Sequence, residues 1–393
     1  MVMTGATLRL SRVVAQHRPV TGRAVAAGSV VWVTCLVLGA QLVPNMPLAA
    51  RSTAASVRNE AVQVVAGITD QQDFARESAV DAFRDVPAGD LLTGLRGKDV
   101  VFAVIESYGR SAVEDPAIAP GVDAVLDDGT QRLAAAGFDT RTGFLTSSTA
   151  GGGSWLAHAT FLSGLWIDNQ QRYRNLVSSD RMTLTSAFHR AGWETTAVMP
   201  GNTAAWPEAA FYGYDRVHNA SGLGYHGPNF SWATTPDQFT LSAFEKLERS
   251  RTDRGPLMTE LALVSSHAPW TPLPRMLGWD ELGDGSVYGP MAVGGGAPEL
   301  ILSTDPAQVK ANFGASIQYS LQSLVSYVET YGDDNLVLVL FGDHQPAPVV
   351  TGPNASRDVP ITVVTRDRSV LDRIGQWGWT RACAPARRPR CGR

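Results

Sequence analysis

Cysteine is scarce in this sequence. Only Cys35, Cys383 and Cys391 occur, and the long stretch between the first two has none. A disulfide framework needs paired cysteines and a thiolate metal site needs clustered ones, so both are excluded for this stretch. A metal bound there must be held by oxygen and nitrogen ligands.

Long runs of basic residues are also missing. The formal net charge is −4 at pH 7, and no block of Lys or Arg is long enough to follow a phosphate backbone. Nucleic-acid binding is therefore disfavoured. What the chain does have is 44% hydrophobic residues over 393 positions, which excludes intrinsic disorder and predicts a sizeable buried core.

Residues 24–43 form an uncharged segment rich in Val, Leu and Ala. At about 1.5 Å per residue, a helix of this length spans the roughly 30 Å hydrocarbon core of a bilayer, so we predict one transmembrane helix. More basic residues precede the segment than follow it, which predicts that residues 1–23 are cytoplasmic and that the remainder faces outward. A cleaved signal peptide is the competing interpretation.

The remainder divides into three parts. Residues 44–95 carry apolar side chains at helical spacing and predict a helical spacer. We expect a catalytic domain over 96–370 and a basic tail rich in Cys, Pro and Arg over 371–393. Pro and clustered Arg supply neither a helical face nor a strand, so residues after Trp379 are not expected to pack. The tail is either a basic segment that meets anionic envelope polymers or the product of a shifted reading frame near Thr380, which we favour.

Short apolar runs alternate with helical stretches through the predicted domain. The runs typical of buried strands are Val100–Ile105, Thr195–Met199, Leu261–Val264, Leu336–Phe341 and Ile361–Val364. Helical spacing recurs between them, for example over Leu184–Ala191 and Val309–Tyr331. The alternation predicts an α/β fold whose mostly parallel sheet is covered by helices on both faces.

Polar residues directly follow four of these runs. They are Glu106-Ser107, Pro200-Gly201-Asn202, Ser265-Ser266-His267 and Gly342-Asp343-His344. In an open α/β sheet the ligand site lies beyond the carboxyl ends of the strands, so we expect these groups to converge. Each alone is typical of an ordinary loop, but together they favour a functional site.

Three of these residues make a suitable ligand set for a metal ion. Glu106, Asp343 and His344 offer two carboxylates and one imidazole, which suits Mn²⁺ or Zn²⁺. Gly342 and Pro346 permit the turn that lets two neighbouring side chains reach one ion. The alternative is a turn that merely ends a strand.

A glycine-rich turn precedes the candidate nucleophile. Gly151–Gly153 lead into Ser154, and helical spacing follows, which places Ser154 at the N-cap of a helix. The positive end of a helix binds anionic tetrahedral groups and favours an alkoxide, so Ser154 is the expected nucleophile. Thr149 and Ser148 are the alternatives for that role, and a plain helix cap is the alternative to any role in catalysis.

Two other motif matches lack the context that would support them. Gly222–Gly227 fits a dinucleotide-binding pattern, but no apolar strand leads into it and Pro228 follows. Cys383–Arg387 has the spacing that formylglycine sulfatases use, but it comes after the metal ligands instead of before them. Neither a dinucleotide fold nor a formylglycine sulfatase is therefore predicted.

Several motifs occur in a fixed order: Val104–Tyr108, Gly153-Ser154, Phe161–Leu165, Gly201-Asn202 with Trp206, Phe211–Asp215, Ser266–Trp270 and Phe341–His344. In this order they resemble the alkaline phosphatase superfamily, and within it the sulfatase-like branch that includes lipoteichoic acid synthase. The resemblance implies one divalent ion, with Mn²⁺ favoured and Zn²⁺ or Mg²⁺ as alternatives, held by Glu106, Ser154, Asp343 and His344. It also implies that His267 contacts the transferred group or protonates the leaving group, and that Asn202 and Trp206 contact the substrate.

The sequence thus predicts a membrane-anchored, metal-dependent enzyme that acts outside the cytoplasmic membrane, in the extracellular or periplasmic space. Its expected substrate is a phosphate or sulfate ester of a lipid or cell-envelope polymer, attacked by Ser154 to form a covalent intermediate. Hydrolysis and transfer to an acceptor alcohol share this first step, so both stay open. The alternative from another class is a non-catalytic protein that uses the same fold to bind an envelope polymer.

Overall fold

The computed structural model describes residues 69–230, 232, 235–292 and 305–386, together with a few positions before residue 69. By its internal contacts the chain divides into two compact units, Met1–Arg76 and Glu77–Arg393. The second unit contains every strand and helix that bears on the predicted domain.

Little of the first unit is described. Strand β1 (Gln41–Val43) pairs antiparallel with β2 (Met46–Pro47), and residues 69–76 are helical. Most of the segment predicted to span a membrane, 24–43, lies outside the described residues. Among the helices that are described, none combines the length and the apolar character needed to cross a bilayer.

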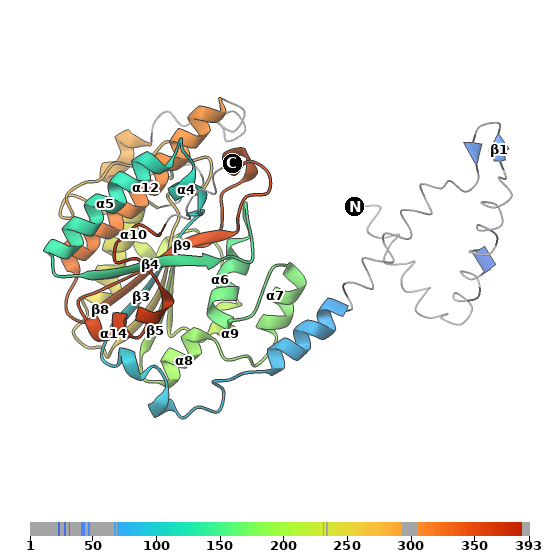
Figure 1. Cartoon of the computed structure of the whole chain (residues 1–393), viewed down its shortest axis with the longest axis horizontal. Coiled ribbons are helices and arrows are strands. Elements are labelled where there is room, and N and C mark those ends of the chain that lie inside the picture. The colour runs from blue at the N-terminus through green and yellow to red at the C-terminus, as the bar shows by residue number, and fades with distance from the viewer. Residues whose placement is uncertain are drawn as a thin grey trace. The chain divides into compact units, whose positions relative to one another are not determined.

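The second unit is built on a seven-stranded sheet with the strand order β4-β9-β8-β3-β7-β5-β6 (Figure 1). The strands are β3 (Asp99–Ile105), β4 (Asp139–Thr146), β5 (Glu194–Met199), β6 (Arg216–Asn219), β7 (Leu257–Leu263), β8 (Leu336–Gly342) and β9 (Asp358–Thr365). The neighbours from β8 to β6 run parallel, whereas β9 is antiparallel to both β8 and β4. The predicted α/β fold with a mostly parallel sheet is therefore confirmed, with one mixed edge.

Four of the apolar runs singled out from the sequence fall within β3, β5, β8 and β9, and the run Leu261–Val264 covers the end of β7 and the residue after it. The pattern missed β4 and β6. Both are edge strands whose residues are only partly buried, so they lack the continuous apolar run of a strand covered on both faces.

Helices cover both faces of the sheet (Figure 1). On one face α5 (Ala119–Ala135) packs along α12 (Pro306–Tyr331), which also contacts α10 (Asp237–Phe244). On the other lie α6 (Ser154–Ser163) and α8 (Leu184–Arg190). The shorter helices are α4 (Ser111–Glu114), α7 (Gln170–Val177), α9 (Ala209–Tyr212), α13 (Pro348–Thr351) and α14 (Arg368–Asp372), with 3-10 turns η1 (Ala88–Asp90), η2 (Thr93–Leu95), η3 (Ala220–Leu223), η5 (Ser286–Met291) and η6 (Gly375–Trp377), and a π-helical turn η4 (Glu245–Arg249).

Alternation along β3 separates the two faces. Val101, Ala103 and Ile105 belong to the apolar core that includes side chains of α5 and α12. Phe102 points to the opposite face, where its ring meets Phe161 of α6 and Phe188 of α8. Successive side chains of a strand leave opposite faces, so a fully apolar strand needs helices on both sides.

The segment predicted as a spacer divides between the two units. Its residues from Glu77 onward belong to the second unit. Arg84 pairs with Asp180 at 3.0 Å, and Arg190 of α8 donates to the carbonyls of Arg84 and Val86, each at 2.9 Å. The second unit therefore includes part of the segment that the sequence pattern placed before it.

The tail corrects a second expectation. Thr380 exchanges two backbone hydrogen bonds of 2.9 Å with Thr142 of β4, and the Cys383 N–H donates to Thr130 of α5 at 2.9 Å. Cys383 is buried in the core. The expectation that nothing after Trp379 packs is therefore wrong for residues 380–386, because the outer edge of β4 offers backbone groups for pairing. These contacts also remove the reason for treating this stretch as a chance sequence.

Truncation after Trp379 should lower the free energy of unfolding by about 1–3 kcal/mol, since buried apolar area and several hydrogen bonds are lost. Urea denaturation measures this change. Truncation after Ala386 is the matched control and should leave stability unchanged. Equal midpoints for the two truncations would show that the docked segment contributes nothing.

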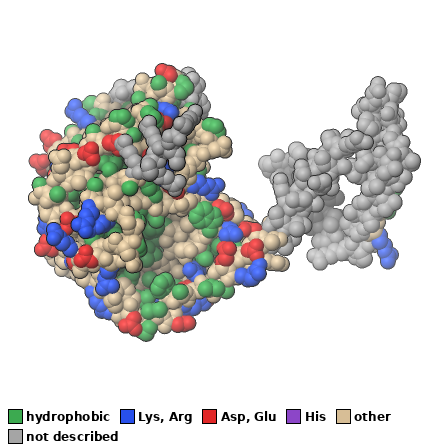
Figure 2. Space-filling view, viewed as in Figure 1, with side chains coloured by type: hydrophobic (Ala, Val, Ile, Leu, Met, Phe, Trp, Pro, Cys, Tyr) green, Lys and Arg blue, Asp and Glu red, His purple; other side chains and the backbone are tan. Residues whose placement is uncertain are grey.

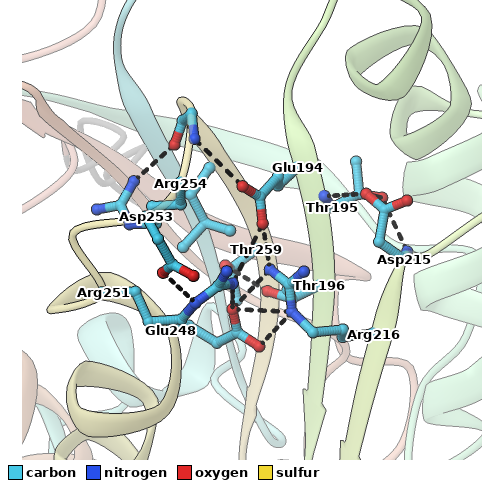
Figure 3. Close-up of polar contacts among 12 residues, drawn as sticks. Glu194, Thr195, Thr196, Asp215, Arg216, Glu248, Arg251, Asp253, Arg254 and Thr259 are labelled. Atoms are coloured by element: carbon cyan, nitrogen blue, oxygen red, sulfur yellow. Dashed lines mark hydrogen bonds and ion pairs between the residues drawn. The ribbon is translucent and has the colours of Figure 1, made fainter.

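Charged side chains are interspersed over the face shown in Figure 2, and a network of them holds the β6 edge of the sheet (Figure 3). Glu248 of η4 is fully buried. It accepts hydrogen bonds from Arg216 at 2.8 Å and from His218 at 2.6 Å. Burial alone would raise the pKa of Glu248, but the hydrogen bonds from His218 and Arg216 lower it to about 2.

This pKa predicts acid sensitivity. The folded-state value lies below the ordinary value of about 4.3, so the stabilisation is complete above about pH 5 and is lost as the pH falls toward 2. It amounts to about 3 kcal/mol. Urea denaturation of wild type and Glu248→Gln should give stabilities that converge over this range. Asp334→Asn, at an exposed partner of Arg366, is the control and should stay parallel to wild type; parallel curves for Glu248→Gln as well would refute the assignment.

Candidate active site

The ends of two neighbouring parallel strands bring the predicted ligands together. Glu106 directly follows β3, and Asp343 and His344 directly follow β8. Ile105 lies opposite Gly342 in the register of the two strands. The three side chains therefore leave the sheet at the same carboxyl edge, as expected for an α/β ligand site.

Close backbone approach makes this junction possible. A Cβ atom on Gly342 would lie only 1.9 Å from the carbonyl oxygen of Tyr108, so no larger residue fits there. Above it, Ser107 has φ of 57°, a strained conformation for a non-glycine residue and typical of functional sites. The Ser107 N–H donates to Asp343 Oδ1 at 2.7 Å, and its hydroxyl donates to Glu106 Oε1 at 2.8 Å.

Ser154 joins this cluster from α6. Its Oγ donates to Glu106 Oε2 at 2.9 Å and lies 3.2 Å from His344 Nε2. The prediction that Ser154 is the N-cap is wrong by one residue: Gly153, with φ of 82°, is the cap, and Ser154 is the first helical residue. A positive φ suits glycine. This shift leaves the Ser154 hydroxyl directed at Glu106 instead of at the helix backbone.

The alternative nucleophiles lie in the preceding loop and have other surroundings. The hydroxyl of Ser148 accepts a hydrogen bond from Thr160 at 2.9 Å. The hydroxyl of Thr149 is buried and has no hydrogen-bond partner within the described part of the chain. Of the three hydroxyls, Ser154 is the one with described contacts to Glu106 and His344.

The cluster fits a divalent cation. One ligand atom from each of Glu106, Asp343 and His344 lies within 4.8 Å of the others. Asp343 Oδ2 is buried and, among the described residues, has no hydrogen-bond partner. A buried carboxylate oxygen without a partner is costly, and a cation would satisfy it. Two carboxylates, an imidazole and a nearby hydroxyl are ligands that Mn²⁺, Zn²⁺ or Mg²⁺ accept.

The electrostatics of the cluster favour added positive charge. Burial and the charge of Asp343 raise the pKa of Glu106. Burial would also raise the pKa of Asp343, but the charges of His344 and His158 bring it below its usual value. The pKa of His344 is raised, because Asp343 and Glu106 outweigh its burial. The negative charges of Glu106 and Asp343 are thus stabilised mainly by neighbouring imidazoles, and a bound cation would stabilise them further.

His267 lies on the same edge, in the loop after β7. It is exposed, and its charge lowers the pKa of Glu106. Its Nδ1 lies 2.7 Å from the carbonyl oxygen of Ala268, and its ring stacks on Trp232 with centroids 6.1 Å apart. His267 is not part of the described ligand cluster. Its predicted contact with the leaving group stays a prediction.

Asn202 and Trp206 lie in the loop after β5. The Asn202 N–H donates to the Met199 carbonyl at 3.0 Å. The ring of Trp206 packs against Tyr212 and Tyr214, with centroids 5.7 and 6.1 Å apart. These contacts place Trp206 in an aromatic group two strands away from β3. The substrate roles predicted for Asn202 and Trp206 stay predictions.

The sequence pattern missed a buried polar group beneath this site. Glu260, in the middle of β7, contacts His158 of α6 at 2.7 Å and accepts a hydrogen bond from Tyr214. Two signals could have found it. Glu260 is the one charged residue of β7, and His158 lies four residues after Ser154, on the same helical face.

Comparison with known proteins gives structural matches only. No family model matches the sequence, and no curated protein matches it. Lipoteichoic acid synthase LtaP from Listeria monocytogenes is 14% identical, with a TM-score of 0.48 over 74% of this chain and 70% of that one. The Streptococcus pyogenes phosphoglycerol transferase GacH, in complex with sn-glycerol-1-phosphate, is 14% identical, with a TM-score of 0.46 over 77% and 75%. The periplasmic domain of Escherichia coli EptC, in complex with Zn, is 14% identical, with a TM-score of 0.46 over 72% and 77%.

These structures are similar to this chain over about three quarters of its length. One fold supports many functions at such low identity, so the function has to be argued from the chain's own site.

The cluster predicts divalent-ion binding. After chelation and reloading with Mn²⁺ or Zn²⁺, elemental analysis should find about one equivalent per chain, and Glu106→Gln or Asp343→Asn should lose it, since each change removes an anionic ligand. Asp237→Asn is the control, because this buried carboxylate contacts Ser265 and Ser320 instead. Full metal content in both cluster variants would show that the ion lies elsewhere.

Proposed function

We propose that this chain is a metal-dependent enzyme of the alkaline phosphatase superfamily that attacks a phosphate or sulfate ester with Ser154. One observation carries the proposal. The Ser154 hydroxyl lies at the first turn of α6, donates to Glu106 and faces His344 Nε2. A hydroxyl held at a helix N-terminus between a carboxylate and an imidazole has the surroundings of an activated nucleophile.

The metal would be held by Glu106, Asp343 and His344, with the Ser154 oxygen as the fourth ligand. A divalent ion bound there would lower the pKa of the hydroxyl and neutralise the charge of the transferred group. Asp343 Oδ2, which has no hydrogen-bond partner among the described residues, and the raised pKa of Glu106 support this assignment. Mn²⁺ is favoured, with Zn²⁺ and Mg²⁺ as alternatives.

The chain's own groups account for the first half-reaction. The first N–H groups of α6 have no partner inside the helix, so those of Ser154 and Trp155 are placed to hold the oxygens of the incoming ester. Ser154 Oγ then bonds to phosphorus or sulfur while its proton passes to the carboxylate of Glu106, which it already faces. The bond to the leaving oxygen breaks.

We propose that His267 protonates the leaving oxygen. Its Nδ1–H faces the Ala268 carbonyl, so the proton given to the leaving oxygen comes from Nε2 of the imidazolium form of His267. In the second half-reaction water or an acceptor alcohol attacks the ester on Ser154, whose oxygen regains a proton. Water gives hydrolysis and an alcohol gives transfer, and the same residues serve both.

We further propose that the enzyme acts outside the cytoplasmic membrane, anchored by residues 24–43. The proposed substrate is a phosphate or sulfate ester of a lipid or cell-envelope polymer, with Asn202 and Trp206 in contact with it. The uncharged segment and the preceding arginines support the location. The motif resemblance supports the substrate class.

Ser154→Ala should reduce turnover of bis(p-nitrophenyl) phosphate by at least about a hundredfold, because only the attacking oxygen is lost. Steady-state kinetics on the Mn²⁺-loaded protein measures the change, and metal content should not fall below about half. Thr149→Val is the matched control: it removes a buried hydroxyl without described hydrogen bonds and should stay within about threefold of wild type.

Two outcomes would contradict the proposal. More than about a tenth of the activity in Ser154→Ala, a barrier change under about 1.4 kcal/mol, would exclude Ser154 as the nucleophile. Absent turnover of phosphate and sulfate esters by the metal-loaded wild type would favour the non-catalytic binding protein instead.

A further inference from the structure

Helix α6 rests on the sheet largely through apolar contacts. The ring of Phe161 lies 5.3 Å from that of Phe102 in β3 and 4.4 Å from that of Phe341 in β8. Such contacts are non-directional, so they hold the helix down without fixing its position along its axis. A displacement of about 1 Å is enough to cost a catalytic group about a hundredfold in rate.

A cavity of about 210 Å³ lies beside helix α6, lined by His158 and Phe161 of α6, by Ser147 and Ser148 of the preceding loop, and by Asp343. A cavity of this size could accept a shifted side chain. Thr160 bonds α6 to Ser148 of the preceding loop, and a further directional contact joins the body of the helix to the sheet itself.

His158 provides that contact. It lies one turn after Ser154 on the same helical face, and its Nδ1 is 2.7 Å from Glu260 Oε1. Glu260 is 1% exposed and stands in β7 between its register partners Phe102 of β3 and Ala197 of β5. A buried carboxylate cannot give up its partners cheaply, so the contact fixes α6 against the sheet.

Glu260 is engaged on its other side as well. Tyr214 donates to Glu260 Oε2, and the Tyr214 ring packs at 6.1 Å from Trp206 and 6.1 Å from Tyr212. One buried carboxylate thus contacts both the helix that begins with Ser154 and the aromatic group that contains Trp206.

We propose that Glu260 is a positioning residue that holds His158 and Tyr214 at once and thereby sets the distance between Ser154 and the substrate wall at Trp206. This inference rests on the proposed function, in which Ser154 attacks and Trp206 contacts the substrate. Glu260 itself does not touch the reacting atoms.

The charge state of the pair supports this role. Burial would lower the pKa of His158, but the charge and hydrogen bond of Glu260 raise it. A charged imidazole facing a carboxylate makes a stronger and more directional hydrogen bond than a neutral pair.

The first test does not depend on turnover. In His158→Ala, hydrogen exchange measured by mass spectrometry should increase at least about tenfold over residues 154–163, since the helix loses its only described polar contact with β7. His158→Asn keeps an N–H near the position of Nδ1 and should restore most of the protection. His189→Ala is the matched control: it removes another imidazole–carboxylate contact, 3.3 Å to Asp215, on α8.

The second test distinguishes the contact of Glu260 with His158 from its contact with Tyr214. Turnover of bis(p-nitrophenyl) phosphate is measured, and the rate of Ser154→Ala is subtracted as background. His158→Ala should lower kcat by about ten- to a hundredfold with little change in KM, because the nucleophile is misplaced. Tyr214→Phe should mainly raise KM, by about three- to tenfold, because the Trp206 wall is loosened.

A triple variant tests whether the three residues contribute to stability alone. It replaces them with apolar side chains: His158→Leu, Glu260→Met and Tyr214→Phe. Buried ion pairs replaced by apolar side chains of similar size often keep or gain stability. We expect a thermal midpoint near that of wild type and a kcat that stays at least about tenfold low. Recovery of kcat together with the midpoint would overturn the proposal.

Unchanged exchange over 154–163 in His158→Ala would overturn it as well, whatever the activity. If wild type shows no turnover above Ser154→Ala, the proposed function fails, and the exchange measurement still decides whether Glu260 positions α6.

Discussion

The geometry of the site depends on two carboxylates, Glu106 and Asp343, which lie close together where β3 and β8 end. The register that sets Ile105 opposite Gly342 brings Glu106 and Asp343 to one level. Like charges in a buried place repel, as the raised pKa of Glu106 reflects. N–H groups, an imidazole and a bound cation stabilise such negative charge, so the junction suits a metal ion. The strained backbone at Ser107 brings its N–H to Asp343.

The surrounding fold supplies the rigidity that such a junction needs. Parallel strands buried on both faces require helices on each side, and aromatic packing of α6 and α8 on the Phe102 side meets that need. Both edges of the sheet are also protected. The docked tail pairs with β4 through Thr380, and the ion pairs of Glu248 hold β6. Unpaired edges would otherwise invite association between chains.

The position of Ser154, the proposed nucleophile, depends on two features of α6. Gly153, in the left-handed region, begins the helix one residue earlier than a serine cap would, and so turns the Ser154 hydroxyl toward Glu106. One turn later, His158 meets Glu260 inside the protein. Two contacts thus set the position of Ser154. The Gly153 cap orients its hydroxyl, and the His158–Glu260 contact holds the helix against the sheet.

The sequence by itself determined the strands buried on both faces and the polar residues that follow them, because such a strand needs a nearly continuous apolar run and polar or turn-forming residues follow its end. It therefore predicted Glu106, Asp343 and His344 as neighbours. Only the tertiary structure decided that Gly153 is the cap, that residues 380–386 dock on β4, and that His158 meets Glu260. These depend on backbone angles and on contacts between residues far apart in the chain, 102 positions for the last pair, and no local pattern encodes them.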